Sequence, residues 1–227
     1  PELWSNGDAI EKAVKTAVPL GEGIFAKLAQ LAQSLHLSLL GSNYALLEGG
    51  KVGNTAVFYG SDGSIRGVYT KIHLFRLMNE HLFFTPGTHL TMVDAGWGKI
   101  GLSICYDLRF PEVYRIYALN GARLICVSAA WPHPRLSHWQ TLLQARAVEN
   151  QLFIAACNRV GVENEVVFPG RSAIVDPWGH TLVEGNDQPG LFVVLRRGCR
   201  FRHRIEPLSF RKGDNPTGQC HGICRWA

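Results

Sequence analysis

Cys105 stands where an apolar, strand-like run gives way to a helical pattern, and this placement makes it the first candidate for chemistry. Residues 101–115, GLSICYDLRFPEVYR, pass from the apolar run through the cysteine into a polar turn and then a helix. A thiol at such a junction could meet backbone N–H donors and the positive end of a helix dipole, which both favour the thiolate. The alternative is that Cys105 is one more small buried hydrophobic residue, which is the commoner case for a cysteine.

A nucleophilic cysteine needs a base for its proton and a site for the oxygen that becomes negative. Three charged residues lie among apolar neighbours: Glu2, Lys71 at the end of the strand-like run IRGVYTK, and Glu80 in an irregular segment. Taken alone, each is more often a surface charge or half of an ion pair than a catalyst. Spacing by itself leaves the two interpretations open.

Two further residues could bind a substrate. Arg109 could hold a carboxylate through two parallel hydrogen bonds; alternatively it pairs with Glu112 or Asp107, a structural role that its place in a turn before a helix favours. Trp131 follows the apolar run LICVSAA, at the edge where the site of an α/β fold would open. It either lines a pocket or packs beneath a loop.

The segments that must position these residues alternate between strand and helix patterns. Apolar runs predict strands over residues 37–47, 51–59, 65–71, 91–94, 99–105, 124–130, 152–157, 172–175, 181–183 and 191–195. Apolar residues at helical spacing predict helices over residues 24–37, 111–120 and 137–150. Strands interleaved with helices and hairpins indicate an α/β fold, with a mixed sheet covered by helices.

Charge and cysteine content exclude several other classes. The chain of 227 residues has a formal charge of +5, and the segment 196–211 alone contains six arginines against one glutamate. A local basic face explains this better than a nucleic-acid surface, so no nucleic-acid partner is expected. No run is apolar and long enough to cross a membrane, and no signal-peptide pattern is present.

The six cysteines show no disulfide framework, which suits a reducing, cytoplasmic compartment. Cys220 and Cys224, with His221 between them, have the spacing of metal ligands. No second pair of this kind exists in the sequence, and we therefore expect no zinc or other metal site.

Four separated segments resemble the carbon–nitrogen hydrolase family, the nitrilase superfamily, and they occur in the family's order. They are PELW at residues 1–4, YTKIHLF at 69–75, GLSICYDLRFPE at 101–112, and RAVENQLFIAACNRVG at 146–161 with GRSAIVDPWG after it. The resemblance implies a layered α-β-β-α sandwich with mixed sheets.

The same resemblance implies a role for each matched residue. Cys105 would be the nucleophile, Glu2 the general base and Lys71 the cation, with Glu80 as an additional acidic residue that holds Lys71 or the substrate. The backbone N–H of Tyr106 would help Lys71 to bind the oxyanion. The family uses no catalytic histidine and no metal or organic cofactor, so we interpret the histidines near these segments as polar loop residues: His73, His81, His133 and His138.

Within the family, residues 71–87 are most similar to the omega-amidase branch, which hydrolyses the terminal amide of 2-oxo acid monoamides. The expected partner is therefore a small-molecule amide. An N-carbamoyl amino acid, an aliphatic amide or a nitrile is the alternative substrate. A catalytically impaired family member that serves as a binding or assembly subunit is the alternative from a different class.

The resemblance covers residues 1–195 and departs from the family at both ends. The family has a strand, a helix and a second strand before the segment that matches PELW, so we expect a hydrolase domain that is truncated at its N-terminus and lacks its first strands. Residues 196–227 resemble only faintly the segment that packs across the family's dimer interface. We expect an atypical basic tail there, and a homodimer or larger homo-oligomer by resemblance alone.

Overall fold

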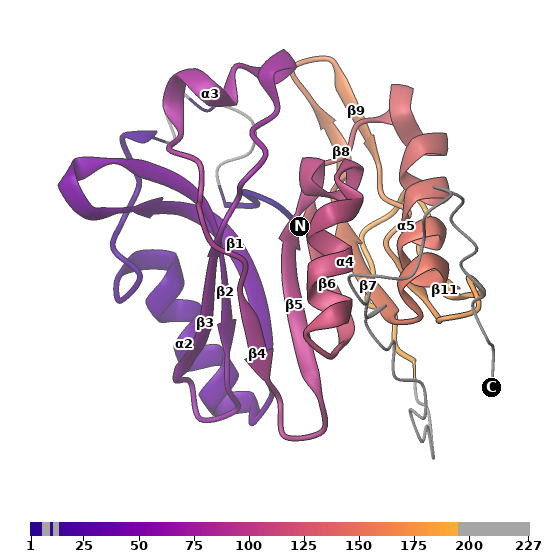
Figure 1. Ribbon diagram of the computed structural model, residues 1–227. Coiled ribbons are helices and arrows are strands. Elements are labelled where there is room, and N and C mark those ends of the chain that lie inside the picture. Colours follow the sequence, from indigo (N-terminus) through magenta and orange to yellow (C-terminus); the bar gives the residue numbers. More distant parts are fainter. Residues whose placement is uncertain (6–9, 11–13, 195–227) are drawn as a thin grey trace, which may run out of the picture.

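The computed structural model describes residues 1–5, 10 and 14–194, which form two stacked β-sheets covered by helices (Figure 1). The first sheet has three antiparallel strands in the order β1-β2-β3: Leu39–Leu46, Val52–Tyr59 and Ile65–Thr70. The turn at residues 61–64 joins β2 to β3 as a hairpin.

The second sheet has six strands in the order β11-β10-β7-β6-β5-β4. In chain order they are β4 (Met92–Asp94), β5 (Lys99–Ile104), β6 (Ala122–Ala129), β7 (Phe153–Asn158), β10 (Ala173–Val175) and β11 (Thr181–Glu184). The central strands β5, β6 and β7 are parallel, whereas β4, β10 and β11 are added antiparallel. The sheet is therefore mixed, as expected.

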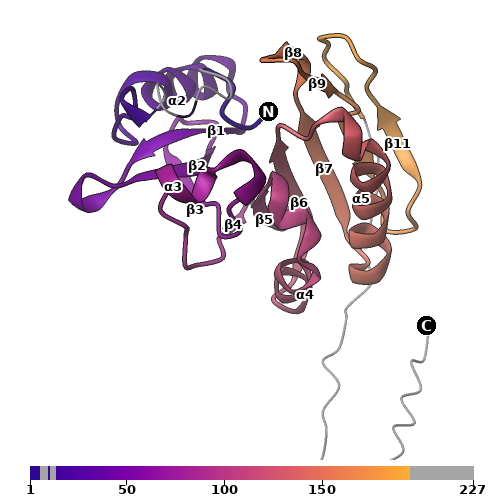
Figure 2. The same ribbon diagram turned by 90° about the horizontal axis from the view of Figure 1, so that it is seen from above.

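Helices cover the outer face of each sheet, which produces four layers (Figures 1 and 2). Helix α2 (Gly23–Leu35) packs on the three-stranded sheet, and α4 (Pro111–Leu119) and α5 (Leu136–Asn150) pack on the six-stranded sheet. The short elements are η1 (Glu48–Gly50), η2 (Arg76–Met78), α3 (Glu80–Phe83), η3 (Cys105–Arg109) and η4 (His133–Arg135). This order of layers confirms the predicted α-β-β-α sandwich.

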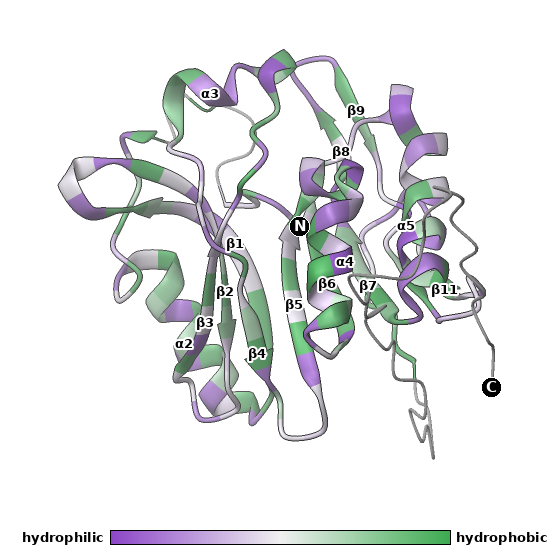
Figure 3. Ribbon diagram, viewed as in Figure 1, coloured by the Kyte–Doolittle hydropathy of each residue, from purple (hydrophilic) through white to green (hydrophobic). Residues whose placement is uncertain are grey.

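The main core lies between the two sheets. Ala56, Phe58 and Tyr69 of the first sheet belong to the same buried cluster as Leu102 and Ile104 of the second. The alternate residues of β2 face α2 instead, because successive side chains of a strand point to opposite faces. With both faces covered, every position of β2 is buried. Helices α4 and α5 mix hydrophobic and hydrophilic residues (Figure 3).

Most predicted elements are confirmed to within a few residues, and two predictions failed. The strand expected over residues 191–195 is wrong for residues 191–194, which form no strand; Leu195 lies outside the described residues. A hairpin that the sequence did not indicate, β8 (Val160–Glu163) with β9 (Val166–Pro169), forms a separate two-stranded sheet. Strand β8 has no buried position, and β9 has only Phe168 and Pro169 buried, so neither four-residue strand gives the long apolar run that signals a buried strand.

Candidate active site

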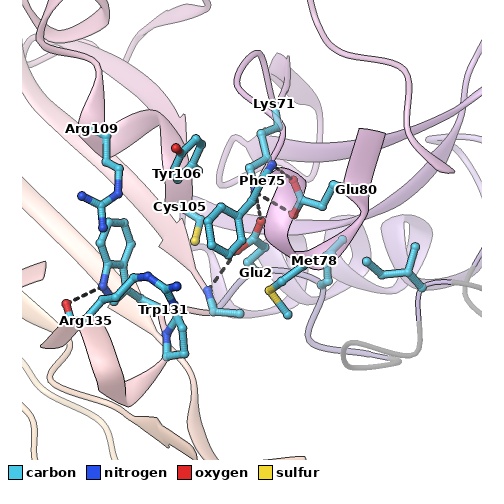
Figure 4. Close-up of a pocket in the computed structure, with 14 residues that line it drawn as sticks. Glu2, Lys71, Phe75, Met78, Glu80, Cys105, Tyr106, Arg109, Trp131 and Arg135 are labelled. Atoms are coloured by element: carbon cyan, nitrogen blue, oxygen red, sulfur yellow. Dashed lines mark hydrogen bonds and ion pairs between the residues drawn. The ribbon is translucent and has the colours of Figure 1, made fainter. Parts of the chain in front are cut away.

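A pocket of about 470 Å³, including its open mouth, lies at the carboxyl ends of strands from both sheets. Lys71 directly follows β3, Cys105 directly follows β5, and Trp131 follows β6. Figure 4 shows Cys105 between an acid–lysine group on one side and a wall of arginine and tryptophan on the other. The lining residues are Glu2, Leu3, Ile10, Lys71, Phe75, Met78, Glu80, Cys105, Tyr106, Arg109, Ala130, Trp131, Pro132 and Arg135.

Lys71 joins two carboxylates at the base of the pocket. Its Nζ donates to Oε1 of Glu2 at 2.7 Å and to Oε1 of Glu80 at 2.8 Å. Lys71 is only 1% exposed, so water contributes little to its solvation. A buried ammonium of this kind is tolerated because it is paired and hydrogen-bonded. The structure therefore brings together all four residues that the sequence nominated for catalysis.

Glu2 is held at several points although it is the second residue of the chain. Its Oε1 accepts from Nδ2 of Asn54 at 2.6 Å, and its Oε2 accepts from the backbone N–H of Ala130 at 3.0 Å. Its own backbone N–H donates to the carbonyl of Ala129 at 3.2 Å. These bonds attach the first residues to the end of β6, and Glu2 is 4% exposed. The carboxylate is thus fixed beside Cys105.

Glu80 reaches the pocket from the short helix α3. Its second oxygen, Oε2, accepts from the backbone N–H of Phe75 at 2.7 Å. The segment after β3 therefore folds back on itself, and Glu80 ties its two ends together while it contacts Lys71. The sequence could only describe residues 73–87 as irregular.

Cys105 adopts a backbone conformation that is unusual for a residue with a side chain. Its φ is 44°, in the left-handed region, at the junction of β5 and η3. Strain of this sort is common where a reactive side chain is presented at a sharp turn. Asp107 stabilises the turn, since its Oδ2 accepts from the backbone N–H of Ile104 at 3.1 Å and from the hydroxyl of Tyr69 at 2.7 Å.

Burial and nearby charges determine the acidity of the Cys105 thiol. The sequence suggested an environment that favours the thiolate, but burial and the negative charge of Glu2 raise the pKa of the Cys105 thiol well above its ordinary value. Burial alone would lower the pKa of Lys71, but Glu2 and Glu80 raise it, so Lys71 stays an ammonium. The thiol therefore keeps its proton until a base removes it.

The two carboxyl groups have different acidities. Burial opposes ionisation of Glu2, but the charge and hydrogen bond of Lys71 outweigh it and lower the pKa of Glu2. For Glu80, burial and the nearby charge of Glu2 prevail over Lys71 and raise the pKa. Glu2 is thus the carboxylate that is ionised and ready to accept a proton next to Cys105.

The candidates for substrate binding line the opposite wall. The guanidinium of Arg109 lies 4.9 Å from the ring centroid of Trp131 and 5.8 Å from that of Tyr106. Its Nη2 is 3.0 Å from Nδ1 of His138. Among the described residues, Arg109 forms no ion pair with Glu112 or Asp107, so the expected structural pairing is not observed. Trp131 lines the pocket, with its indole N–H bonded to the carbonyl of Arg135 at 2.7 Å.

Sequence reasoning missed Asn54, Phe75, Met78 and Arg135. Asn54 offered a signal, because it is an amide side chain within the mostly apolar run KVGNTAVFY of a buried strand. Arg135 offered none, since nothing in its neighbours distinguishes it from a surface arginine. His73 bonds to Asp107 and stacks on Phe110, which agrees with a structural rather than a catalytic role.

The part of the chain that the structure describes offers no cluster of metal ligands and no helix suited to a membrane. There, no group of three or more histidine, cysteine or acidic residues could hold a metal ion. No helix in that part has the length and apolar character needed to cross a membrane. The cysteine pair with ligand-like spacing, Cys220 and Cys224, and the whole basic segment 196–227 lie outside the described residues.

Comparison with known proteins agrees with this geometry. A curated relative, the 2-oxoglutaramate amidase of Bacillus subtilis (strain 168), is 38% identical over 208 residues, which cover 90% of this chain and 80% of the relative. The crystal structure of XC1258 from Xanthomonas campestris, a CN-hydrolase superfamily protein with an arsenic adduct in its active site, superposes with a TM-score of 0.77 at 34% identity. That match covers 83% of this chain and 72% of the other.

A second solved structure shows the reactivity of a related site. In a mutant of the amidase from Nesterenkonia sp. AN1, acrylamide has added to the active-site cysteine. That structure has a TM-score of 0.77 and 30% identity, and the match covers 84% of this chain and 75% of that one. The family model described as carbon-nitrogen hydrolase matches residues 1–195. The chain therefore belongs to the carbon–nitrogen hydrolase family.

Proposed function

We propose that the protein is an amidase of the omega-amidase type, which hydrolyses the terminal amide of a small 2-oxo acid monoamide to a carboxylate and ammonia. The observation that carries this proposal is the contact of Lys71 with both Glu2 and Glu80 in a pocket that also contains Cys105 and two arginines. The 2-oxoglutaramate amidase from Bacillus subtilis supports the choice of substrate class.

The first half of the reaction forms a thioester and releases ammonia. Glu2 accepts the thiol proton while Sγ of Cys105 attacks the amide carbon. Lys71 and the backbone N–H of Tyr106 stabilise the negative oxygen of the tetrahedral intermediate. Glu2 then returns the proton to the leaving nitrogen, the carbon–nitrogen bond breaks, and ammonia departs. Glu80 keeps Lys71 in position.

The second half consumes water. Glu2 takes a proton from a water molecule as its oxygen attacks the thioester carbon, and the same two donors stabilise the oxyanion. The carbon–sulfur bond breaks, Cys105 recovers its proton from Glu2, and the carboxylic acid product leaves. A base that is ionised in the resting state and a thiol that retains its proton fit this sequence of transfers.

Arg109 and Arg135 would bind the carboxylate at the far end of the substrate. Both line the pocket across from Lys71, and each lies against an aromatic ring, Arg109 at 4.9 Å from Trp131 and Arg135 at 5.5 Å from Phe75. These ring contacts orient the guanidinium groups, whose planar forks suit a carboxylate.

The decisive experiment measures ammonia released from 2-oxoglutaramate. The wild-type protein should hydrolyse 2-oxoglutaramate, and the activity of Cys105→Ala should be lower by a factor of at least about a thousand. Cys157→Ala, which removes an exposed cysteine, is the matched control and should be unaffected. If the protein hydrolyses only N-carbamoyl amino acids, aliphatic amides or nitriles, the proposed type of reaction stands but the proposed substrate is wrong. A folded protein without any turnover, whose Cys105 also resists iodoacetamide, would favour the binding or assembly subunit.

The arginine pair has its own test. Arg135→Gln and Arg109→Gln should each raise KM for 2-oxoglutaramate about tenfold or more, because a carboxylate contact is lost. Hydrolysis of butyramide, which has no carboxylate, should change little. Arg66→Gln, at an exposed ion pair with Asp62, controls for loss of positive charge. Equal losses on both substrates would assign the arginines a structural role.

The protein is further proposed to form a homodimer in the cytoplasm. Large apolar residues are exposed on α4, α5 and the turn between β10 and β11: Ile116, Leu119, Val148 and Trp178. A second copy could bury this surface. The described cysteines 105, 126 and 157 are free, which suits a reducing compartment. Sedimentation analysis of wild type and Leu119→Glu tests the dimer, since the variant should be monomeric.

A further inference from the structure

Among the described residues, Asn54 is the side chain of β2 that forms a hydrogen bond with the acid–lysine group of Glu2, Lys71 and Glu80. It is fully buried, in a strand whose other positions are buried as well. Its Nδ2 donates to Oε1 of Glu2 at 2.6 Å, the same oxygen that accepts from Lys71 at 2.7 Å. The amide must face the carboxylate with its nitrogen, because a carboxylate oxygen can only accept.

The backbone of Asn54 contacts the second member of the site. Its carbonyl accepts from the backbone N–H of Lys71 at 2.8 Å, directly after the last residue of β3. Asn54 therefore positions Glu2 through its side chain and Lys71 through its main chain. Glu2 is attached to the rest of the molecule from the other side by Ala129 and Ala130.

The side-chain oxygen of Asn54 forms no comparable hydrogen bond. Oδ1 of Asn54 is buried, and no donor among the described protein groups reaches it. An apolar side chain at this position would avoid the cost of burying an unpaired oxygen. The N–H group that Asn54 donates to Glu2 therefore explains why an asparagine is present.

We propose that Asn54 is a positioning residue that holds the carboxylate of Glu2 in its ionised, proton-accepting state beside Cys105. The inference rests on the proposed role of Glu2 as the base. The charged and titratable groups that face Glu2 are Lys71 after β3, Glu80 on α3 and Cys105 on η3. Of these, Lys71 and the hydrogen bond from the Cys105 thiol favour the ionised form, and Asn54 adds a neutral donor that no change of pH removes.

Asn54→Ala should move the acid limb of the kcat profile upward by about one pH unit, so that kcat falls about tenfold at pH values below the acid limb of the wild type and changes little at neutral pH, with little change in KM. Asn54→Asp has the same size but replaces the donor with a second carboxyl group 2.6 Å from Glu2. Two carboxyl groups at that distance share one proton, so kcat should fall further than in the alanine variant. If Asn54→Ala does not fold, this variant of equal volume decides the question.

Asn150→Ala is the matched control. Asn150 is a buried asparagine whose Oδ1 also has no partner among the described residues, but it lies at the end of α5 and does not line the pocket. Its replacement should lower the melting temperature and leave the pH profile of kcat unchanged. If Asn54 had only a structural role, Asn54→Ala would likewise lower the melting temperature and leave the pH profile of kcat unchanged.

A measurement without substrate separates this inference from the proposed function. The ¹³C carboxyl resonance of Glu2, assigned by its loss in Glu2→Gln, should titrate about one pH unit higher in Asn54→Ala than in wild type. That shift would support the positioning role even if 2-oxoglutaramate is not a substrate. Folded Asn54 variants with an unchanged Glu2 titration and unchanged acid limb would overturn it.

Discussion

At the scale of single residues, Glu2 and Cys105 depend on each other through charge. The negative carboxylate raises the pKa of the thiol, and we propose the same carboxylate as the base that takes its proton. The resting site thus avoids a free thiolate, and the nucleophile forms only as its proton is removed. Lys71 also affects the pKa of the thiol. Its ammonium pairs with Glu2 and Glu80 and offsets part of their negative charge.

Glu2→Gln should separate the two effects. Removal of the negative charge lowers the pKa of Cys105, so the pH midpoint for alkylation by iodoacetamide should shift downward. Turnover should nevertheless fall by about a hundredfold or more, because no base remains. Mass spectrometry of the Cys105 peptide across a pH series measures the midpoint, with exposed Cys157 as the internal reference. A midpoint that stays constant or rises would contradict the coupling.

At the scale of elements, the junction of β5 and η3 presents the nucleophile. Asp107 accepts bonds from Ile104, Tyr69 and both the backbone and the ring of His73, so strands of both sheets converge on one carboxylate. The contact with Tyr69 crosses from β3 to η3. The left-handed conformation at Cys105 persists because the surrounding bonds define the turn.

Tyr69→Phe should loosen this junction. Loss of the 2.7 Å bond to a buried carboxylate should lower the free energy of unfolding by about 1–3 kcal/mol. Because the turn that holds Cys105 relaxes, kcat should also fall about tenfold. Denaturant unfolding and steady-state kinetics measure the two effects.

Tyr117→Phe is the matched control for that prediction. The hydroxyl of Tyr117 is also buried, but it bonds to the carbonyl of Leu102, within β5 rather than at the turn. It should lower stability to a similar extent while kcat stays near the wild-type value. Equal loss of kcat in both variants would show that general destabilisation, not the junction, governs activity.

At the scale of the whole molecule, the stacked sheets bring distant parts of the chain to one edge. Glu2 and Ala130 are 128 residues apart in sequence and share a hydrogen bond. The pocket therefore depends on the core between the sheets as much as on its own contacts. Any change that shifts one sheet relative to the other separates Lys71 from Cys105.

Leu102→Ala tests the core between the sheets. Leu102 is fully buried, and its truncation should lower the free energy of unfolding by about 2–5 kcal/mol through lost burial and a residual cavity. Leu35→Ala, at a position 53% exposed on α2, should cost about 0.5 kcal/mol or less. Urea unfolding of the two variants measures the difference, and similar losses would place the stabilising core elsewhere.

A truncated chain tests the domain boundary at the same scale. We propose that residues 1–195 form the hydrolase domain and that residues 196–227 are a basic tail outside it, as the span of the family match suggests. A variant that ends at residue 195 should keep its kcat within about twofold, since every described residue that lines the pocket precedes residue 136. A large loss of activity in the folded variant would make the tail part of the enzyme.

The sequence by itself determined the order of the main elements and the catalytic candidates. The runs around β2, β5, β6 and β7 are apolar enough to mark buried strands without any partner in view, since a strand covered on both faces needs no alternation. The motifs around Lys71 and Cys105 likewise pointed to the carbon–nitrogen hydrolase family before any contact was known.

Only the tertiary structure decided how those residues act. Whether Glu2 is a loose terminal charge or an anchored base depends on Asn54 and Ala130, which come from two different sheets. The acidity of the Cys105 thiol did not follow from its place at a strand–helix junction, because a pKa responds to burial and to charges that approach through space rather than along the chain. The roles of Asn54 and Arg135 were hidden for the same reason: they arise from distances that only the stacked sheets create.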